Sequence, residues 1–327
     1  MLKIKKWIAA LLFAVLFITF AYAGGDLLMP PRTEYGCMWE SYLQEDKNTI
    51  DVLFCGSSLV YCDVIPAQIW KNTGLTSYVV AGPEQTIPIS YYYLREACRT
   101  QSPKAIFLEV SMMYYNKYQR YTQTNISYMP WSLNRLAATL NAAEEERKPG
   151  LLFPLFDYHG RIYDLSLDEI RQNLNPEKDV LAGYTLLTEN AVQKENRYRV
   201  FKYAESNYEN NLSYLNKLSD FCRQQNIKLF FYVAPCKLQI DKGLMARLKA
   251  DLYNIPNAGF EDFNDCVTEM GLSDTNDWYN RTHLNITGAK KFTDILGGYI
   301  SEKAGISPGG KADLPTWNER AEFIDTK

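Results

Sequence analysis

Residues 51–85 read DVLFCGSSLVYCDVIPAQIWKNTGLTSYVVAGPEQ, and this stretch decides the fold. DVLFC (51–55) is a short, continuous apolar run that ends at a glycine, which is typical of a strand buried on both faces. AQIWKNTG (67–74) follows a proline and predicts a helix that stops at its own glycine. SYVVA (77–81) repeats the strand pattern. A strand, a helix and a second strand in this order predict a β-α-β unit with parallel strands.

The same alternation continues along the chain. The further predicted elements are a helix at 89–99, a strand at 105–110, a helix at 208–225, a strand at 228–233, a helix at 243–253, a strand at 259–263 and a closing helix at 287–304 with Thr287 as its N-cap. This spacing predicts a three-layer α/β/α domain with a mostly parallel, flavodoxin-like sheet. Residues 112–190 lack strand periodicity and are too long for a connecting loop, so we predict an inserted, largely helical lid or subdomain there.

The N-terminus reads MLKIKKWIAALLFAVLFITFAYAGG (1–25) and predicts export. Three lysines precede an uncharged apolar run at 7–23, which is at the lower limit for spanning a bilayer. The basic flank predicts a cytoplasmic N-terminus and an extracytoplasmic remainder. Ala21–Ala23 also fits the small-x-small rule for signal cleavage, so a signal peptide cut after Ala23 and an uncleaved membrane anchor both remain open.

The domain organisation follows from these patterns. We predict a signal anchor or signal peptide at 1–25, a stem at 26–48, an α/β domain at 49–111 and 191–305, the helical insert at 112–190 and a C-terminal tail at 306–327. The stem assignment depends on the Pro30-Pro31 pair and on mixed charge.

Composition excludes several classes of function. The chain has 327 residues, 46% of them hydrophobic and 22% charged, which is typical of a globular protein. A net charge of -3 and the lack of a basic helix argue against nucleic-acid binding. There are only two histidines, His159 and His283, and seven cysteines without a CxxC pair. We therefore predict no metal site and no cofactor.

Candidate catalytic residues lie at two places in the sequence. The first predicted strand runs into GSSL (56–59), where a glycine turn presents a serine at the edge of the sheet where ligands bind. A phosphate-binding turn or a helix N-cap has the same pattern, but the block is not a P-loop because GxxxxGK[ST] is absent. GxSxG is absent as well, which argues against an α/β-hydrolase nucleophile elbow. The second place is DTNDWYNRTHLNITGAKKF (274–292), which precedes the closing helix. A lone histidine is usually structural, but a serine nucleophile needs a base and His283 can supply it.

Together these blocks resemble the SGNH/GDSL hydrolase superfamily. The strand-GSSL block, Gly82 after the second strand and the late HLNxxGA resemble most its exported, membrane-tethered bacterial branch of envelope polysaccharide O-acyltransferases and teichoic-acid D-alanylation proteins. FDYHGRIYDL (156–165) is similar to a YHxRW segment in the insert of that branch. The resemblance implies an SGNH-type sheet, Ser58 as nucleophile, His283 as general base and then acid, and the N–H groups of Ser58 and Gly82 as oxyanion donors. It also implies an acylated glycan or small acyl ester as substrate and a membrane-bound O-acyltransferase as partner.

The chain departs from the family pattern in two respects. Asn280 stands where the family DxxH motif has its aspartate, and an asparagine accepts a hydrogen bond from an imidazole without stabilising the imidazolium. Three alternatives remain open. Asp277 or Asp274 supplies the carboxylate that Asn280 lacks, a Ser-His dyad works slowly without one, or the site has decayed. The GxND block is missing after the third strand, and Gln85 is a candidate replacement donor. Two functions follow: an exported serine esterase or O-acyltransferase, or a catalytically impaired protein that binds glycan or a membrane acyltransferase.

Overall fold

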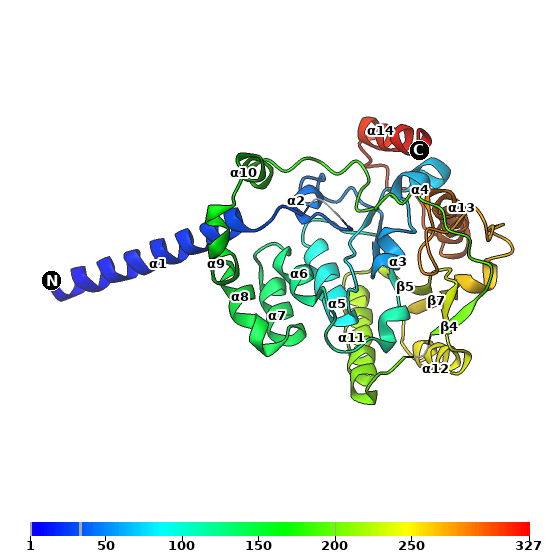
Figure 1. The fold of residues 1–327 in the computed structure, drawn as a ribbon, viewed down its shortest axis with the longest axis horizontal. Coiled ribbons are helices and arrows are strands. Elements are labelled where there is room, and N and C mark those ends of the chain that lie inside the picture. The colour runs from blue at the N-terminus through cyan, green and yellow to red at the C-terminus, as the bar shows by residue number, and fades with distance from the viewer. Residues whose placement is uncertain (1, 33–34, 200) are drawn as a thin grey trace.

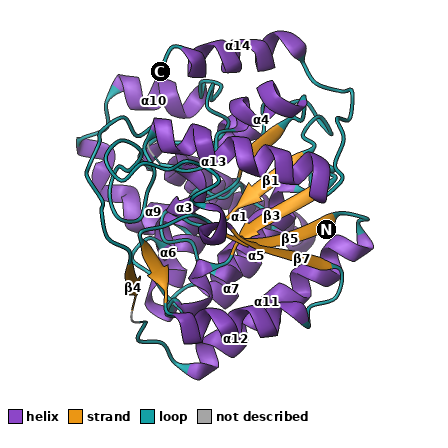
Figure 2. Ribbon diagram, turned by 90° about the vertical axis from the view of Figure 1, so that its right-hand side faces the viewer, coloured by secondary structure: helices purple, strands orange, loops and turns teal. Residues whose placement is uncertain are grey.

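A computed structural model of the chain describes residues 2–32, 35–199 and 201–327. Its centre is a five-stranded parallel sheet (Figures 1 and 2). The strands are β1 (Val52–Cys55), β2 (Ser77–Val79), β3 (Ala105–Glu109), β5 (Lys228–Val233) and β7 (Ala258–Asp262). Their spatial order is β2-β1-β3-β5-β7, and every neighbouring pair is parallel. This is the doubly wound, flavodoxin-like order, and it confirms the predicted fold class.

Helices cover both faces of the sheet, as Figure 2 shows. One face carries α5 (Ile87–Ala97), α11 (Glu205–Gln224) and α12 (Lys242–Tyr253), and the other carries α4 (Pro66–Thr73) and α13 (Ile286–Gly298). Leu53 and Cys55 of β1 belong to the apolar cluster on the first face, whereas Val52 and Phe54 belong to the cluster on the second. Because successive side chains of a strand point to opposite faces, a strand covered on both sides must be apolar throughout.

The closing helix begins differently from the prediction. Thr287 is not its N-cap: α13 starts at Ile286, and the Asn285 side chain accepts hydrogen bonds from the backbone N–H groups of Thr287 and Gly288, both at 3.1 Å. Asparagine and threonine are both good N-caps, so the sequence favours neither strongly. After α13, Tyr299–Lys303 continues as a π-helical turn.

The insert is helical, as predicted. It contains α6 (Thr122–Ser127), α7 (Leu133–Ala142), α8 (Lys148–Leu152), α9 (Pro154–Tyr158) and α10 (Leu167–Leu174), with 3-10 turns at Glu145–Arg147 and His159–Tyr163. Helix α7 packs against α5 of the main domain, and α9 and α10 contact the N-terminal helix. His159 is exposed in the second 3-10 turn, and its Nδ1 lies 3.1 Å from the carbonyl oxygen of Phe156.

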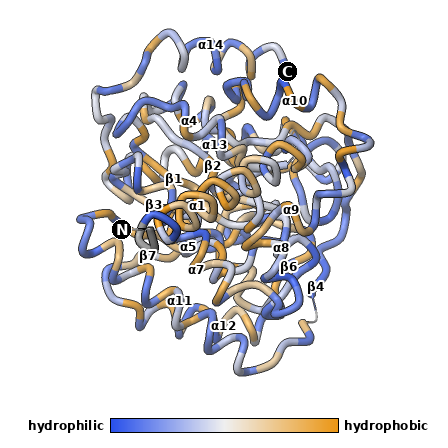
Figure 3. Tube along the Cα trace, turned by 90° about the vertical axis from the view of Figure 1, so that its left-hand side faces the viewer, coloured by the Kyte–Doolittle hydropathy of each residue, from blue (hydrophilic) through white to orange (hydrophobic). Residues whose placement is uncertain are grey.

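Helix α1 (Leu2–Leu28) extends from the domain, and Figure 3, in which it projects toward the viewer, shows its apolar character. Its part from Lys5 to Leu28 is long and apolar enough to cross a membrane, as a membrane anchor or a signal sequence would be. Its C-terminal end is tied to the insert. The carbonyl oxygen of Leu28 accepts from Arg161 Nη1 at 2.6 Å, and that of Leu27 accepts from Asn173 Nδ2 at 3.1 Å.

The segments predicted as stem and tail belong to the folded domain. Helix α2 (Trp39–Tyr42) buries both of its terminal aromatic side chains in the core. Helix α14 (Leu314–Asp325) packs against α4 and buries Trp317. Arg320 of α14 forms a buried ion pair with Glu45, which joins the two segments. The prolines and mixed charges of these segments therefore mark irregular backbone rather than a lack of packing.

Candidate functional site

A cavity of about 200 Å³ lies at the carboxyl end of the sheet, where an open parallel sheet places its ligands. Ser58 and His283 both line it, although they lie near opposite ends of the α/β domain in the sequence. Its other lining residues are Leu59, Glu84, Ser111, Tyr115, Arg199, Phe201, Val233, Ala234, Cys236, Leu238, Gln239, Ile240, Asn264 and Thr282. The fold thus brings the two principal predicted residues together.

Gly56 makes the turn that presents Ser58. Its φ is +152°, and a Cβ at this position would lie 2.6 Å from Val60 Cγ2 and 2.9 Å from the Cβ of Glu109. Only glycine fits this conformation and this space. The chain then enters the single helical turn α3 (Ser58–Tyr61), so that Ser58 is half-buried at the cavity. Among the described residues, none accepts a hydrogen bond from the N–H of Ser58, and this group can therefore serve a ligand.

His283 sits on a loop that is fixed through its backbone. Its carbonyl oxygen accepts from the N–H of Tyr279 at 3.0 Å, and the next residue, Leu284, forms a β-bridge with Trp278. The ring is half-buried, and burial lowers the pKa of His283 to about 4. The imidazole is therefore neutral at pH 7, which leaves it free to accept a proton, but a pKa this low makes it a weak base. Its Nδ1 is buried without a hydrogen-bond partner, and no hydrogen bond joins Ser58 to His283 in the described part of the chain.

Asn280 does not contact the imidazole. Its Oδ1 accepts three hydrogen bonds, from the N–H of Thr282 at 2.7 Å, from the hydroxyl of Thr282 at 2.7 Å and from the N–H of His283 at 3.0 Å. This is the local side-chain-to-backbone bonding by which asparagine stabilises turns. Asn280 therefore shapes the loop that carries His283, and its acceptor atom is already occupied.

The two aspartates suggested as substitutes are paired with lysines. Asp277 is fully buried, and its Oδ2 accepts from the N–H of Ser273 at 2.6 Å and from Lys291 Nζ at 2.7 Å. Asp274 pairs with Lys237 at 2.7 Å. In the described part of the chain, neither carboxylate forms a hydrogen bond or ion pair with His283, which favours a Ser-His dyad over a triad.

Asp63 is a buried acid that the sequence analysis missed. It lies five residues after Ser58, and its Oδ1 accepts from the N–H of Leu284 at 3.0 Å. Its Oδ2 is buried and has no partner. Burial raises the pKa of Asp63 well above its usual value. This carboxyl ties the serine turn to the histidine loop, and a single acid inside the apolar run LVYCDVI (59–65) is the signal that marks it.

The predicted oxyanion donors divide into one at the cavity and two outside it. The N–H of Ser58 is at the cavity, whereas Gly82 and Gln85 do not line it. The N–H of Gly82 lies 3.4 Å from the carbonyl oxygen of Gly56. The Gln85 amide donates to Ser90 Oγ at 3.0 Å and to Cys55 Sγ at 3.4 Å. Gln85 is fully buried and binds within the core, so its contacts do not match the predicted role.

A second, two-stranded sheet forms one wall of the cavity. Strands β4 (Arg197–Arg199) and β6 (Leu238–Ile240) pair in parallel. Neither is visible as a strand in the sequence, because each is short and neither is a run of buried apolar residues. Arg199 of β4 lines the cavity, and its guanidinium lies over the rings of Tyr115 and Phe201 at 5.3 and 5.0 Å. The cavity thus offers a cation and aromatic surface beside the serine and the histidine.

Glu109 is a second titratable group next to the site. It is fully buried at the end of β3 and accepts hydrogen bonds from the N–H and the hydroxyl of Ser111, at 3.0 and 2.9 Å. Burial raises the pKa of Glu109 to about 7, against the lowering effect of these hydrogen bonds. Because Ser111 lines the cavity, Glu109 lies one hydrogen bond away from the cavity wall.

Comparison with known proteins adds no family to this geometry. No protein-family model matches this chain, and no curated protein matches it. Within residues 2–32, 35–199 and 201–327, no group of three histidine, cysteine or acidic side chains is placed to hold a metal ion. The arrangement itself offers a serine hydroxyl, a neutral imidazole and a free backbone N–H on one small cavity, which is a set of groups suited to acyl transfer.

Proposed function

We propose that the protein is an exported serine esterase or O-acyltransferase of the SGNH/GDSL type that acts on acyl esters of cell-envelope glycans. The observation that carries this proposal is the placement of Ser58 and His283 on one cavity at the carboxyl end of the sheet. The parallel strand order and the Gly56 turn support it, because they are what the serine block of that superfamily requires. The acylated glycan as substrate is an inference from the sequence resemblance.

The proposed reaction has two halves. The Ser58 hydroxyl attacks the acyl carbonyl while His283 takes its proton, and the tetrahedral oxyanion receives a hydrogen bond from the N–H of Ser58. The ester bond then breaks, and His283 returns the proton to the departing alcohol. Water or a sugar hydroxyl next attacks the acyl-enzyme, again giving its proton to His283, and Ser58 is released as the hydroxyl. Formation of the Ser58–His283 hydrogen bond on substrate binding is usual for such sites.

The contacts of His283 favour slow turnover in the proposed reaction. In a full triad, a carboxylate on Nδ1 orients the ring and stabilises the imidazolium, and removing that charge costs about 10⁴ in kcat in the serine-protease example of this mechanism. Here Nδ1 has no partner. A dyad with one oxyanion donor in place is suited to an activated acyl donor or to transfer within a complex, which fits a membrane acyltransferase as the partner.

We further propose that α1 is retained as an uncleaved anchor that holds the domain on the extracytoplasmic side of the membrane. The basic residues before the apolar run favour this orientation. Cleavage after Ala23 would remove Tyr22, whose ring packs edge-on against Trp131 at 4.6 Å. It would also cut a helix that continues without a break to Leu28.

The test uses two adjacent serines. Ser57 is buried and its hydroxyl has no hydrogen-bond partner, so Ser57→Ala is a matched control for Ser58→Ala. We expect wild type and Ser57→Ala to be labelled by a fluorophosphonate probe and to hydrolyse p-nitrophenyl acetate, and Ser58→Ala to do neither. Equal labelling of Ser58→Ala and wild type would refute the proposal.

The alternative is a catalytically impaired protein that binds glycan at the same cavity. The occupied acceptor of Asn280 and the unpartnered Nδ1 of His283 favour it. It predicts no labelling of the wild type, together with saturable binding of an O-acetylated polysaccharide. That binding should weaken when Arg199, which lies over two aromatic rings of the cavity, is replaced by glutamine.

A further inference from the structure

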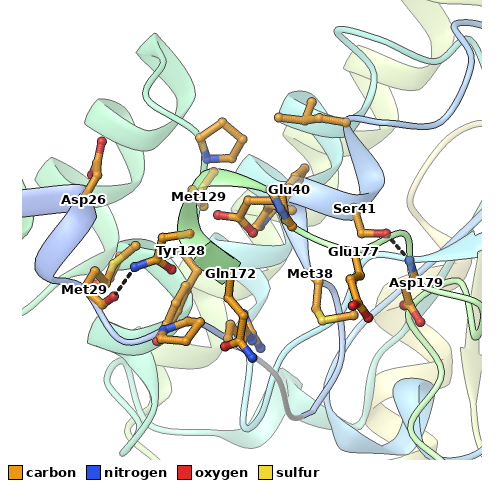
Figure 4. Close-up of a pocket in the computed structure, with 18 of the residues that line it drawn as sticks. Asp26, Met29, Met38, Glu40, Ser41, Tyr128, Met129, Gln172, Glu177 and Asp179 are labelled. Carbon is orange, nitrogen blue, oxygen red and sulfur yellow. Dashed lines mark hydrogen bonds between the residues drawn. The ribbon is translucent and has the colours of Figure 1, made fainter. Parts of the chain in front are cut away.

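A larger cavity, of about 590 Å³, lies where α1 ends. Its wall is built from the end of α1 at Asp26, from residues 29–32 and 38–43, from residues 127–135 of the insert and from residues 172–180. Figure 4 shows Asp26, Tyr128 and Glu40 around this space. It shares no lining residue with the Ser58 cavity, and the proposed acyl transfer gives it no role.

The side chains of this cavity include buried donors that lack acceptors. Among its described lining residues, four side-chain nitrogens are buried without a hydrogen-bond partner: Arg32 Nη1, Trp39 Nε1, Arg135 Nε and Arg135 Nη2. No lining oxygen is in the same condition. Buried polar groups are nearly always paired, and an unpaired one costs about 1–3 kcal/mol. A ligand that pairs with these donors must therefore be an acceptor. The hydroxyl of Tyr93 lies beside Arg32 and Trp39, but it donates its own proton to the carbonyl oxygen of Asn125.

Arg135 is the strongest of these donors. Its side chain is 2% exposed, lies 3.6 Å over the ring of Trp131 and makes one hydrogen bond, from Nη1 to the carbonyl oxygen of Met129 at 2.8 Å. No carboxylate lies within ion-pair distance of Arg32 or Arg135 in the described part of the chain. Asp26 acts on Arg135, and Glu40 on Arg32, only from beyond that distance. An anion in direct contact would therefore offset more of the desolvation cost of these guanidinium groups.

In the described part of the chain, the acidic residues of the wall form no ion pair with Arg32 or Arg135. Asp26 accepts from Trp131 Nε1 at 3.1 Å, and Asp179 accepts from the backbone N–H groups of Leu181 and Gly183. Burial raises the pKa of both Asp26 and Glu40, and this effect is opposed by the charge of Arg135 for Asp26 and by that of Arg32 for Glu40. Glu177 and Lys178 are exposed neighbours of opposite charge at the rim.

The cavity lies beside an apolar surface of the insert that adjoins α1. The exposed apolar residues there are Leu133, Phe153, Phe156, Ile162, Tyr163, Leu167 and Leu174, several of them more than 60% exposed. Helices α9 and α10 carry part of this set, and both contact α1. Apolar side chains next to a membrane-spanning helix are expected to enter the bilayer interface, which places the cavity at the depth of lipid headgroups.

We propose that this cavity binds a phosphate ester, with the guanidinium groups of Arg32 and Arg135 as its main ligands. The planar fork of an arginine matches the oxygens of a phosphate, and the remaining donor, Trp39 Nε1, supplies a further hydrogen bond. The position beside α1 makes an anionic phospholipid headgroup the favoured source. A soluble phosphate ester offers the same chemistry and is separated from it by the experiment.

The test uses the full chain in dodecyl maltoside micelles, titrated with dihexanoyl phosphatidylglycerol, inorganic phosphate or dihexanoylglycerol. Trp39 and Trp131 line the cavity, so tryptophan fluorescence reports occupancy. We expect saturable binding of the phospholipid that is weakened at least tenfold by Arg135→Gln and by Arg32→Gln. Arg171→Gln is the matched control, because this arginine is exposed on α10 and pairs with Asp168. If Arg135→Gln does not fold, Arg32→Gln carries the test alone.

The three probes separate the outcomes. Binding of the phospholipid without inorganic phosphate assigns the site to a lipid headgroup, whereas binding of both assigns it to phosphate itself. Equal binding of dihexanoylglycerol, no binding of any probe, or unchanged affinity in both arginine variants would overturn the proposal. Ser58→Ala should bind as the wild type does, so failure of this proposal is distinguishable from failure of the proposed acyl chemistry.

Discussion

The two cavities differ in which polar groups they leave without a partner. Around the Ser58 cavity, the predicted helpers have other partners: Asn280 bonds the loop backbone, Asp277 Oδ2 bonds Lys291 and the Gln85 amide bonds Ser90, while Asp277 Oδ1 is buried without a partner. Around the cavity at the end of α1, the unpartnered atoms are all donors on arginine and tryptophan. The first arrangement suits a reaction at one serine, whereas the second suits retention of an anion.

The largest expected effect concerns His283. Replacement by glutamine removes the imidazole that serves as the proposed base at the Ser58 cavity, so we expect esterase activity to fall by about 10³-fold or more. Phospholipid binding at the other cavity should not change, because His283 does not line it. Hydrolysis of p-nitrophenyl acetate and the fluorescence titration measure both in one preparation. Loss of binding together with activity would show that the two cavities are not independent.

The two cavities also differ in how much of them the sequence predicts. The Ser58 cavity follows from patterns that the sequence displays: a strand that ends at Gly56 and a histidine just before a helix, both at the carboxyl end of a parallel sheet. Side-chain partners were not predictable, since Asn280 bonds its own loop and Asp63 reaches a residue far away in sequence.

The second cavity was beyond prediction for a different reason. Its walls come from segments with no periodic pattern, which the sequence indicates only as a stem and an insert. Burial of Trp39 and Arg135 depends on how these segments pack on each other. Long-range packing of irregular chain has no local signature, so neither residue stands out in the sequence.

Glu109 is expected to give a pH-dependent change in stability. Its folded pKa, about 7, is above its usual value, so the unfolded chain ionises first as the pH rises. The wild type should therefore lose about 3 kcal/mol of unfolding free energy between about pH 4.5 and pH 7, relative to Glu109→Gln. Urea unfolding of both proteins at pH 5 and pH 8 measures this difference. An equal difference at both pH values would contradict the raised pKa of Glu109.

Asp63 offers a smaller effect that bears on the missing carboxylate. Asp63→Ala leaves the N–H of Leu284 unpaired, and we expect a loss of about 1–3 kcal/mol of stability together with reduced probe labelling. Asp63→Asn keeps an oxygen for that hydrogen bond and should retain both. If Asp63→Asn is as stable as the wild type but is labelled as weakly as Asp63→Ala, the negative charge of Asp63 acts on His283.

The smallest effect is expected at Asn280, where the family pattern has an aspartate. Asn280→Asp restores the sequence motif, but the Oδ1 that would meet the imidazole already accepts from Thr282 and from the N–H of His283. An aspartate can accept the same three hydrogen bonds, so we expect esterase activity to change less than about threefold. An increase of tenfold or more would show that the loop rearranges to bring residue 280 onto Nδ1. In that event the Ser58 cavity would be an intact site limited by one side chain. The two cavities would then differ less in how completely their functional groups are in place than the contacts indicate.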